Sequence, residues 1–81
     1  MTLRVRLFAL AKETVGAEAC AVELPEAGTV ADLKNVLAER FPALATTVRL
    51  SMVAVNADYA SPSRVLLATD DIALIPPVSG G

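Results

Sequence analysis

The stretch Thr29–Pro42 reads TVADLKNVLAERFP and contains the clearest helix signal of the chain. Thr29 is a good N-cap residue, and Asp32, three positions later, brings the start close to a capping box. Apolar residues then recur at helical spacing, and Pro42 ends the helix because the residue before a proline disfavours helical backbone. This pattern predicts one amphipathic helix whose apolar stripe must be covered by another layer. The stripe consists of Val30, Leu33, Val36, Leu37 and Phe41.

Two segments with a period of two precede this helix. In residues 3–8 the alternation puts Phe8 on the face opposite the apolar residues, and residues 19–24 alternate in the same way. Such alternation is typical of half-buried strands and predicts a hairpin-like pair. Residues 9–15, between the two strands, are expected to form one or two helical turns that end at Gly16. The side chains expected to face inward are Leu3, Val5, Leu7, Cys20, Val22 and Leu24.

Short strands also follow the helix. Residues 52–56 predict a third strand and residues 72–75 the last one, and all four residues of the last strand are apolar. Residues 43–50 could form either a loop or one more helical turn. A short strand and a pinned loop are both possible for Leu66 and Leu67. Turns are expected at 56–58, at 61–63 and at 69–71, where Asp70 and Asp71 are turn formers.

One helix and four or five short strands must share a single core, because 81 residues suffice for one small domain. The economical arrangement is a two-layered α+β fold, a mixed sheet with the helix packed across one face. A right-handed crossover through the helix lets the first and last strands lie side by side. We therefore predict a β-grasp domain over residues 1–75, followed by an extended tail over residues 76–81.

Composition excludes several classes of function. The net charge of −2 argues against a nucleic-acid partner, which needs a basic surface. The chain has one cysteine, Cys20, and no histidine, so it cannot by itself form a disulfide scaffold, a zinc knuckle or a serine–histidine catalytic pair. Cys20 is expected to be a packed small side chain. Charges within the apolar pattern of the first residues argue against a signal peptide or membrane contact, and a cytoplasmic location is expected.

The last six residues, PPVSGG, have an unusual combination of properties. The two prolines favour an extended chain, and the final two residues have no Cβ. Six extended residues reach roughly 20 Å, enough to enter another protein's pocket. No side chain among them ionises, so the tail can lose its water without burying a side-chain charge. The residues expected to insert into a partner are Pro77, Val78, Ser79, Gly80 and Gly81. A frayed end on a plain interaction domain is the alternative.

A terminal glycine carboxylate is suited to activation. A free carboxylate is a poor electrophile, whereas reaction with ATP converts it to an acyl adenylate. Sulfide, or an enzyme persulfide, could then displace AMP and leave a thiocarboxylate on Gly81. Side chains at positions 80 and 81 would obstruct the enzyme that surrounds the terminal carbonyl. We therefore predict that Gly81 is the reactive residue. Gly80 is expected to keep the tail narrow where it enters the partner.

Several parts of the chain resemble a known family, the small sulfur-carrier subunit of molybdopterin synthase (the MoaD family). The ending PPVSGG, residues 76–81, is the specific part, and the likeness covers nearly the whole chain. The other parts are Leu7-Phe8-Ala9 with Lys12-Glu13 and Gly16, Thr29-Val30 with Leu33, Val55-Asn56 with Tyr59, and Asp70-Asp71-Ile72-Ala73 running into Ile75.

The resemblance implies a ubiquitin-like β-grasp fold. It also implies a cycle in which Gly81 is loaded with sulfur and then gives the sulfur up. A separate ATP-using enzyme would adenylate Gly81, and sulfur drawn ultimately from cysteine would make the thiocarboxylate. The tail would then enter the large synthase subunit, where cyclic pyranopterin monophosphate becomes molybdopterin. In that family the large subunit performs the pterin chemistry, so this chain would be a non-catalytic sulfur donor in an assembly of two large and two small subunits. Phe8, Tyr59 and Ile75 stand where the family places apolar partner contacts.

Two other functions share this fold and ending. One is the sulfur carrier for thiazole synthesis in the thiamine pathway, although the two prolines and the length favour the molybdopterin branch. The other is a ubiquitin-like modifier whose terminal glycine forms isopeptide bonds with lysines. For Phe8, a ring that caps the edge of the core is the alternative to a partner contact. The direction of Ile75 is open, because strict alternation would have to fail for it to face the partner.

Overall fold

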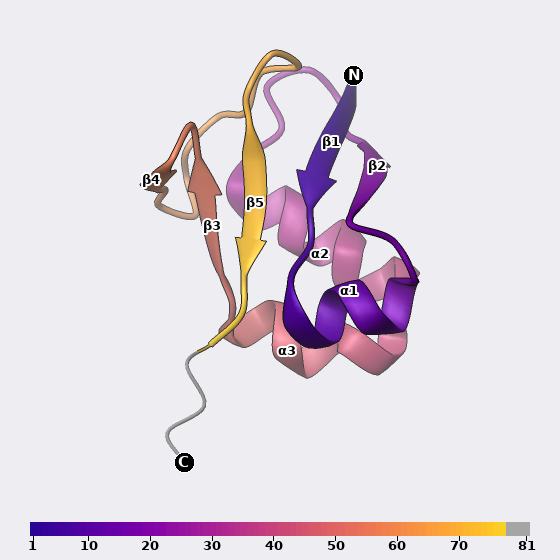
Figure 1. Cartoon of the computed structure of the whole chain (residues 1–81). Helices are drawn as coiled ribbons and strands as arrows, with labels where there is room; N and C mark the ends of the chain where they lie inside the picture. The colour runs from indigo at the N-terminus through magenta and orange to yellow at the C-terminus, as the bar shows by residue number, and fades with distance from the viewer. Residues whose placement is uncertain (78–81) are drawn as a thin grey trace.

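The computed structural model describes residues 1–77, which form a five-stranded mixed sheet with helices packed across one face (Figure 1). The predicted two-layered α+β class is therefore confirmed. The strands are β1 (Thr2–Arg6), β2 (Ala19–Glu23), β3 (Met52–Val55), β4 (Asp58–Tyr59) and β5 (Ile72–Ile75). The helices are α1 (Ala9–Val15), α2 (Val30–Arg40), the 3₁₀ helix η1 (Pro42–Leu44) and α3 (Ala45–Leu50).

The first and last strands are neighbours at the centre of the sheet. The strand order is β2-β1-β5-β3-β4, with β1 parallel to β5 and every other pair antiparallel. Figure 1 shows β1 and β5 side by side, both running away from the N-terminus. The predicted adjacency is confirmed, and β5 is hydrogen-bonded to a strand on each side.

Helix α2 begins as its sequence predicts. The Thr29 side chain accepts a hydrogen bond from the Asp32 backbone N–H at 3.3 Å, and the Thr29 N–H donates to the Asp32 carboxylate at 2.9 Å. This capping box satisfies N–H groups that the first helical turn leaves without partners. The helix ends at Arg40, and its C-cap residue, Phe41, stands directly before Pro42.

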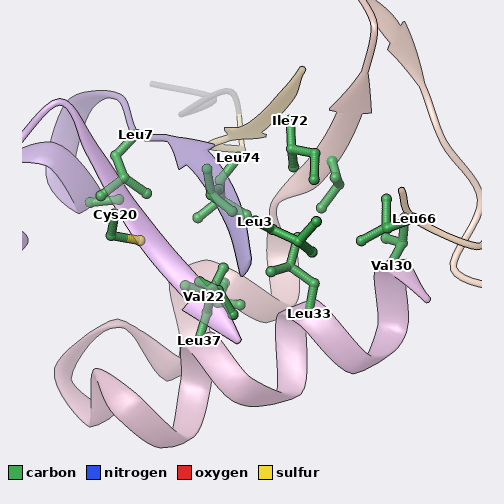
Figure 2. Close-up of a cluster of buried hydrophobic side chains, with 14 of the residues drawn as sticks. Leu3, Leu7, Cys20, Val22, Val30, Leu33, Leu37, Leu66, Ile72 and Leu74 are labelled. Carbon is green, nitrogen blue, oxygen red and sulfur yellow. The ribbon is translucent and has the colours of Figure 1, made fainter. Parts of the chain in front are cut away.

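The core lies between the sheet and α2, and it contains the side chains predicted to face inward. Figure 2 shows Leu33 and Leu37 of α2 pointing toward Leu3 of β1 and Val22 of β2. Cys20 is buried in the same cluster, as expected. Burial raises the pKa of the Cys20 thiol, although the positive charge of Arg40 partly offsets this. The thiol therefore stays protonated and packs as a small apolar group.

Two predicted segments are more regular than expected. The stretch 43–50, ambiguous in the sequence, contains the end of η1 and a six-residue α3, because Leu44 and Val48 are buried against the core. The break expected at 56–58 is a two-residue hairpin turn that leads into β4. Asn56 and Ala57 both have positive φ, at 53° and 71°, as type I′ turns require.

The remaining differences concern strand ends and one loop. The strand predicted over 3–8 ends at Arg6, because Phe8 is the N-cap of α1. Leu66 forms a pinned loop rather than a strand: its N–H donates to the Gly28 carbonyl at 2.9 Å and its side chain is buried. Gly16 ends α1 as predicted, with a φ of 80°. Within residues 1–77, no helix is long and apolar enough to cross a membrane.

Candidate functional site

The root of the tail is held by the central strand of the sheet. β5 ends at Ile75, which pairs with Met52 of β3, and the chain continues through a half-buried Pro76 to an exposed Pro77. Ile72 and Leu74, on the inner side of β5, are fully buried. The tail thus starts from a strand fixed by two neighbours and by the core. The other predicted tail residues lie outside the described residues: Val78, Ser79, Gly80 and Gly81.

The face of the sheet opposite the helices presents a separate set of side chains. In Figure 1, α2 lies behind the sheet and this outer face is turned toward the viewer. Register puts Met52 and Ile75 side by side on it, with Tyr59 across from Ala54 further along β3. Tyr59 is 65% exposed and Met52 51%. We call Phe8, Met52, Tyr59 and Ile75 the docking face.

Phe8 stands at the edge of this face, beyond the end of β1. Its backbone is extended, with φ −135° and ψ 160°, and it serves as the N-cap of α1 without a side-chain hydrogen bond. Phe8 is 40% exposed. Because β1 and β5 are parallel, Phe8 follows β1 at the same end of the sheet at which Ile75 precedes the tail. The predicted contact residues therefore share the outer side with the root of the tail.

Comparison with known proteins adds a second line of support. A model of the ThiS family matches residues 5–81. This chain belongs to the ThiS family. Among its relatives is the molybdopterin synthase sulfur carrier subunit of Dictyostelium discoideum, 36% identical over 96% of this chain and 94% of that protein. The protein of the same name from Caenorhabditis briggsae is 34% identical over 100% of this chain and 99% of its own length.

Solved structures show the same fold. The crystal structure of SAMP1, small archaeal modifier protein 1, from Haloferax volcanii superimposes on this ThiS-family chain with a TM-score of 0.81. The two are 30% identical, and the match covers 100% of both chains. The ubiquitin-like β-grasp fold implied by the sequence resemblance is therefore confirmed.

A charged pair crosses the outer face of this ThiS-family chain. Arg6 of β1 donates two hydrogen bonds, from Nε and Nη2, to the two carboxylate oxygens of Asp71, each at 3.0 Å. Its guanidinium carbon also lies 6.0 Å from the centre of the Phe8 ring. This fork-like pairing fixes the plane of the guanidinium beside the docking face.

The loop that leads into β5 is held by a second polar cluster. Asn56, in the β3–β4 turn, donates to the Asp70 carboxylate at 3.0 Å and accepts from the Asp71 N–H at 2.9 Å. The Leu67 N–H also donates to Asp70, at 2.8 Å. The backbone N–H of Leu67 lowers the pKa of Asp70 most. Burial is the next largest cause and opposes it, but Asn56 and the charge of Arg64 lower the pKa further, so the net shift is downward. Asp70 thus ties the loop before β5 to the β3–β4 turn.

The sequence predicted three partner-contact residues, and the structure adds Met52 to the same outer face. The structure places Phe8, Tyr59 and Ile75 on the outer side, and their contact with a partner stays a prediction. Alternation along residues 52–56 contained the signal for Met52, since it places Met52 opposite the buried Val53 and Val55. The pairing of Arg6 with Asp71 had no local signal.

Proposed function

We propose that this chain is the sulfur carrier of molybdenum cofactor biosynthesis and that Gly81 is the residue that carries the sulfur. The observation that supports this most strongly is the Gly-Gly pair at positions 80 and 81, five and six residues beyond a central strand, in a chain whose relatives are named molybdopterin synthase sulfur carrier subunits. The folded part, residues 1–75, serves as a handle that a partner recognises. The segment 76–81 enters that partner.

The loading reaction has two steps. A carboxylate oxygen of Gly81 attacks the α-phosphorus of ATP, and pyrophosphate leaves. Hydrosulfide, or an equivalent delivered by an enzyme persulfide and a reducing thiol, then attacks the acyl carbon, and AMP leaves. A separate adenylating enzyme performs this chemistry. The chain itself supplies the Gly81 carboxylate, and glycine at positions 80 and 81 adds no side chain beside it.

The unloading reaction takes place in the large synthase subunit. There the thiocarboxylate sulfur forms a bond to a carbon of cyclic pyranopterin monophosphate as it becomes molybdopterin. Water then cleaves the bond between this sulfur and the acyl carbon, so that Gly81 returns to a carboxylate. The large subunit performs the pterin chemistry, so this chain is a co-substrate rather than a catalyst. We propose an assembly of two large and two small subunits, in which Phe8, Tyr59 and Ile75 contact the large subunit.

The outer face supports this docking in physical terms. Apolar side chains that stay exposed on a folded domain are typical of interaction surfaces, and aromatic residues often dominate their binding energy. Phe8 and Tyr59 are two of the three aromatic residues of the chain, and both are exposed. Since Ile75 directly precedes the tail, docking of this face would hold Gly81 within roughly 20 Å of the contact.

Reconstitution tests the proposal. The protein is loaded with ATP, its adenylating enzyme and a sulfur source, and is then mixed with the large synthase subunit and cyclic pyranopterin monophosphate. We expect molybdopterin to form with the intact chain and not with a variant that lacks Gly81, while the circular dichroism of the two is the same. Equal product from both would refute the proposal. Product only with the thiazole synthase of the thiamine pathway would reassign the chain to that pathway.

A role as a protein modifier is the second candidate, favoured by the 30% identity to SAMP1 over the whole chain. Adenylation of Gly81 is common to both functions, but a modifier then forms an amide with a lysine of another protein. Denaturing purification of the tagged chain from cells separates the two. Covalent adducts that disappear without Gly81 would support the modifier, whereas only the free chain is expected from a sulfur carrier.

A further inference from the structure

Arg6 is an unusual residue to find beside an apolar docking face. It points outward from β1, opposite Ala73 of β5, with its side chain 43% exposed. A guanidinium has five N–H groups, and Arg6 uses one on Nε and one on Nη2 for Asp71. Within residues 1–77, no acceptor is hydrogen-bonded to its Nη1. Arg6 is therefore held in place and still has donors to offer.

Arg6 lines a hollow of about 230 Å³ between β1 and the start of α1. Lys12 pairs with Glu18 at 3.5 Å across it, while Arg6 pairs with Asp71. Arg4 has no carboxylate within 4.0 Å among the described residues, so the hollow has an excess of positive charge in a chain of net charge −2. Its lining residues are Arg4, Arg6, Leu7, Phe8, Lys12 and Glu18.

An apolar partner surface would be a poor match for this region. Burying a charged group without new hydrogen bonds costs free energy, because the water that solvated it is removed. A partner that covers Phe8 must also cover the adjoining guanidinium, whose carbon lies 6.0 Å from the ring centre. The partner must therefore bring an acceptor, and the positive charge of the hollow favours a carboxylate.

We propose that the large synthase subunit inserts an aspartate or glutamate side chain into this hollow, against Nη1 of Arg6, and that Arg6 thereby helps determine which large subunit this chain accepts. The inference rests on the proposed function. Asp71 is a positioning residue, because its fork-like pairing fixes the guanidinium of Arg6, which lines the hollow. Arginine suits this role better than lysine, since one planar group can serve two carboxylates.

The test measures the affinity of the full chain for the purified large subunit by isothermal titration calorimetry. Arg6→Leu should weaken binding about tenfold, although leucine enlarges the apolar surface. Arg6→Lys should recover part of the loss. Arg49→Leu is the matched control: it makes the same change of charge on α3, in the helical layer, and should leave affinity unchanged. Raising ionic strength from about 0.05 M to about 0.5 M should narrow the gap between wild type and Arg6→Leu.

The outcomes separate this inference from the function on which it rests. Equal or tighter binding by Arg6→Leu, with normal wild-type binding, would overturn the role of Arg6 and leave the carrier function intact. A large subunit that does not bind wild type would overturn both. Thermal unfolding of each variant serves as the folding control, because an exposed ion pair contributes only about 0–1 kcal/mol to stability.

Discussion

The two faces of one sheet have different tasks in this molecule. On β5, Ile72 and Leu74 point inward and are fully buried under α2, whereas Ala73 and Ile75 point to the other side. The inner residues are uniformly apolar, because their only requirement is to fill the core. The outer side combines exposed apolar residues with the ion pair of Arg6 and Asp71. Residues that fill the core therefore alternate, along the same strands, with the residues that we propose for recognition.

The largest expected effect is a loss of stability when a residue on the inner side of the sheet is truncated. Leu33 is fully buried between α2 and the sheet, so Leu33→Ala should lower the free energy of unfolding by about 2–5 kcal/mol. Met52→Ala, on the outer face, should cost less than about 1 kcal/mol, because Met52 is half exposed. Urea denaturation measures both. Similar losses from the two substitutions would abolish the distinction between the faces.

The next largest effect is a loss of affinity for the large synthase subunit when a residue on the outer side of the sheet is truncated. Phe8→Ala should weaken binding to the large synthase subunit by about 1–2 kcal/mol and change the free energy of unfolding little, because the ring is exposed. Val65→Ala is the control, since Val65 is similarly exposed but pairs with Thr29 at the start of α2. Calorimetric titration measures the affinities. A loss of stability in Phe8→Ala as large as its loss of affinity would place Phe8 with the core instead.

A third prediction concerns the loop that precedes β5, the strand that contributes residues to both faces of the sheet. The folded pKa of Asp70 is lower than its unfolded value, so its ionised form stabilises the fold above about pH 4. This contribution is lost as the pH falls through the folded pKa. Asp70→Asn should therefore be less stable than wild type by about 1 kcal/mol at pH 7, and the difference should shrink at pH values below 4. Urea denaturation across this range would refute the prediction if the difference stayed constant.

The smallest effect comes from the turn between β3 and β4. Ala57 has a φ of 71°, where a side chain is strained and glycine is not. Ala57→Gly should raise the free energy of unfolding by about 0.5 kcal/mol, after the greater unfolded-state entropy of glycine is subtracted. Ala54→Gly, the same substitution in extended backbone, should lower it by a similar amount. Thermal unfolding of the pair gives the comparison, and two changes of the same sign would contradict it.

The sequence predicted those parts of the fold whose signals are local. The start of α2 needed only Thr29 and Asp32, three residues apart, and alternation sufficed for the inward side of β1. α3 was harder to predict because Thr46, Thr47 and Val48 are β-branched and disfavour helix. Tertiary burial of Val48 outweighs that preference. β4 was overlooked because it depends on positive φ at Ala57, and alanine gives no sign of such a conformation.

The candidate site was predictable to a similar extent. Alternation placed Phe8 on the outer side, but Ile75 was expected to face outward only if strict alternation failed. That expectation was wrong, because alternation holds along β5: Ile72 and Leu74 are buried on the inner side and Ile75 lies on the outer one. Arg6 and Asp71 are 65 residues apart and meet only because β1 and β5 are parallel neighbours. Such a contact follows from topology and cannot be derived from local sequence.

The most direct test of the central claim is the intact mass of the chain purified from cells under non-reducing, thiol-free conditions. We predict a fraction in which one oxygen of Gly81 is replaced by sulfur, located by fragmentation to the last residue. This fraction should disappear in cells that lack the adenylating enzyme. A chain that never shows the substitution, while its cells still make molybdopterin, would contradict the account.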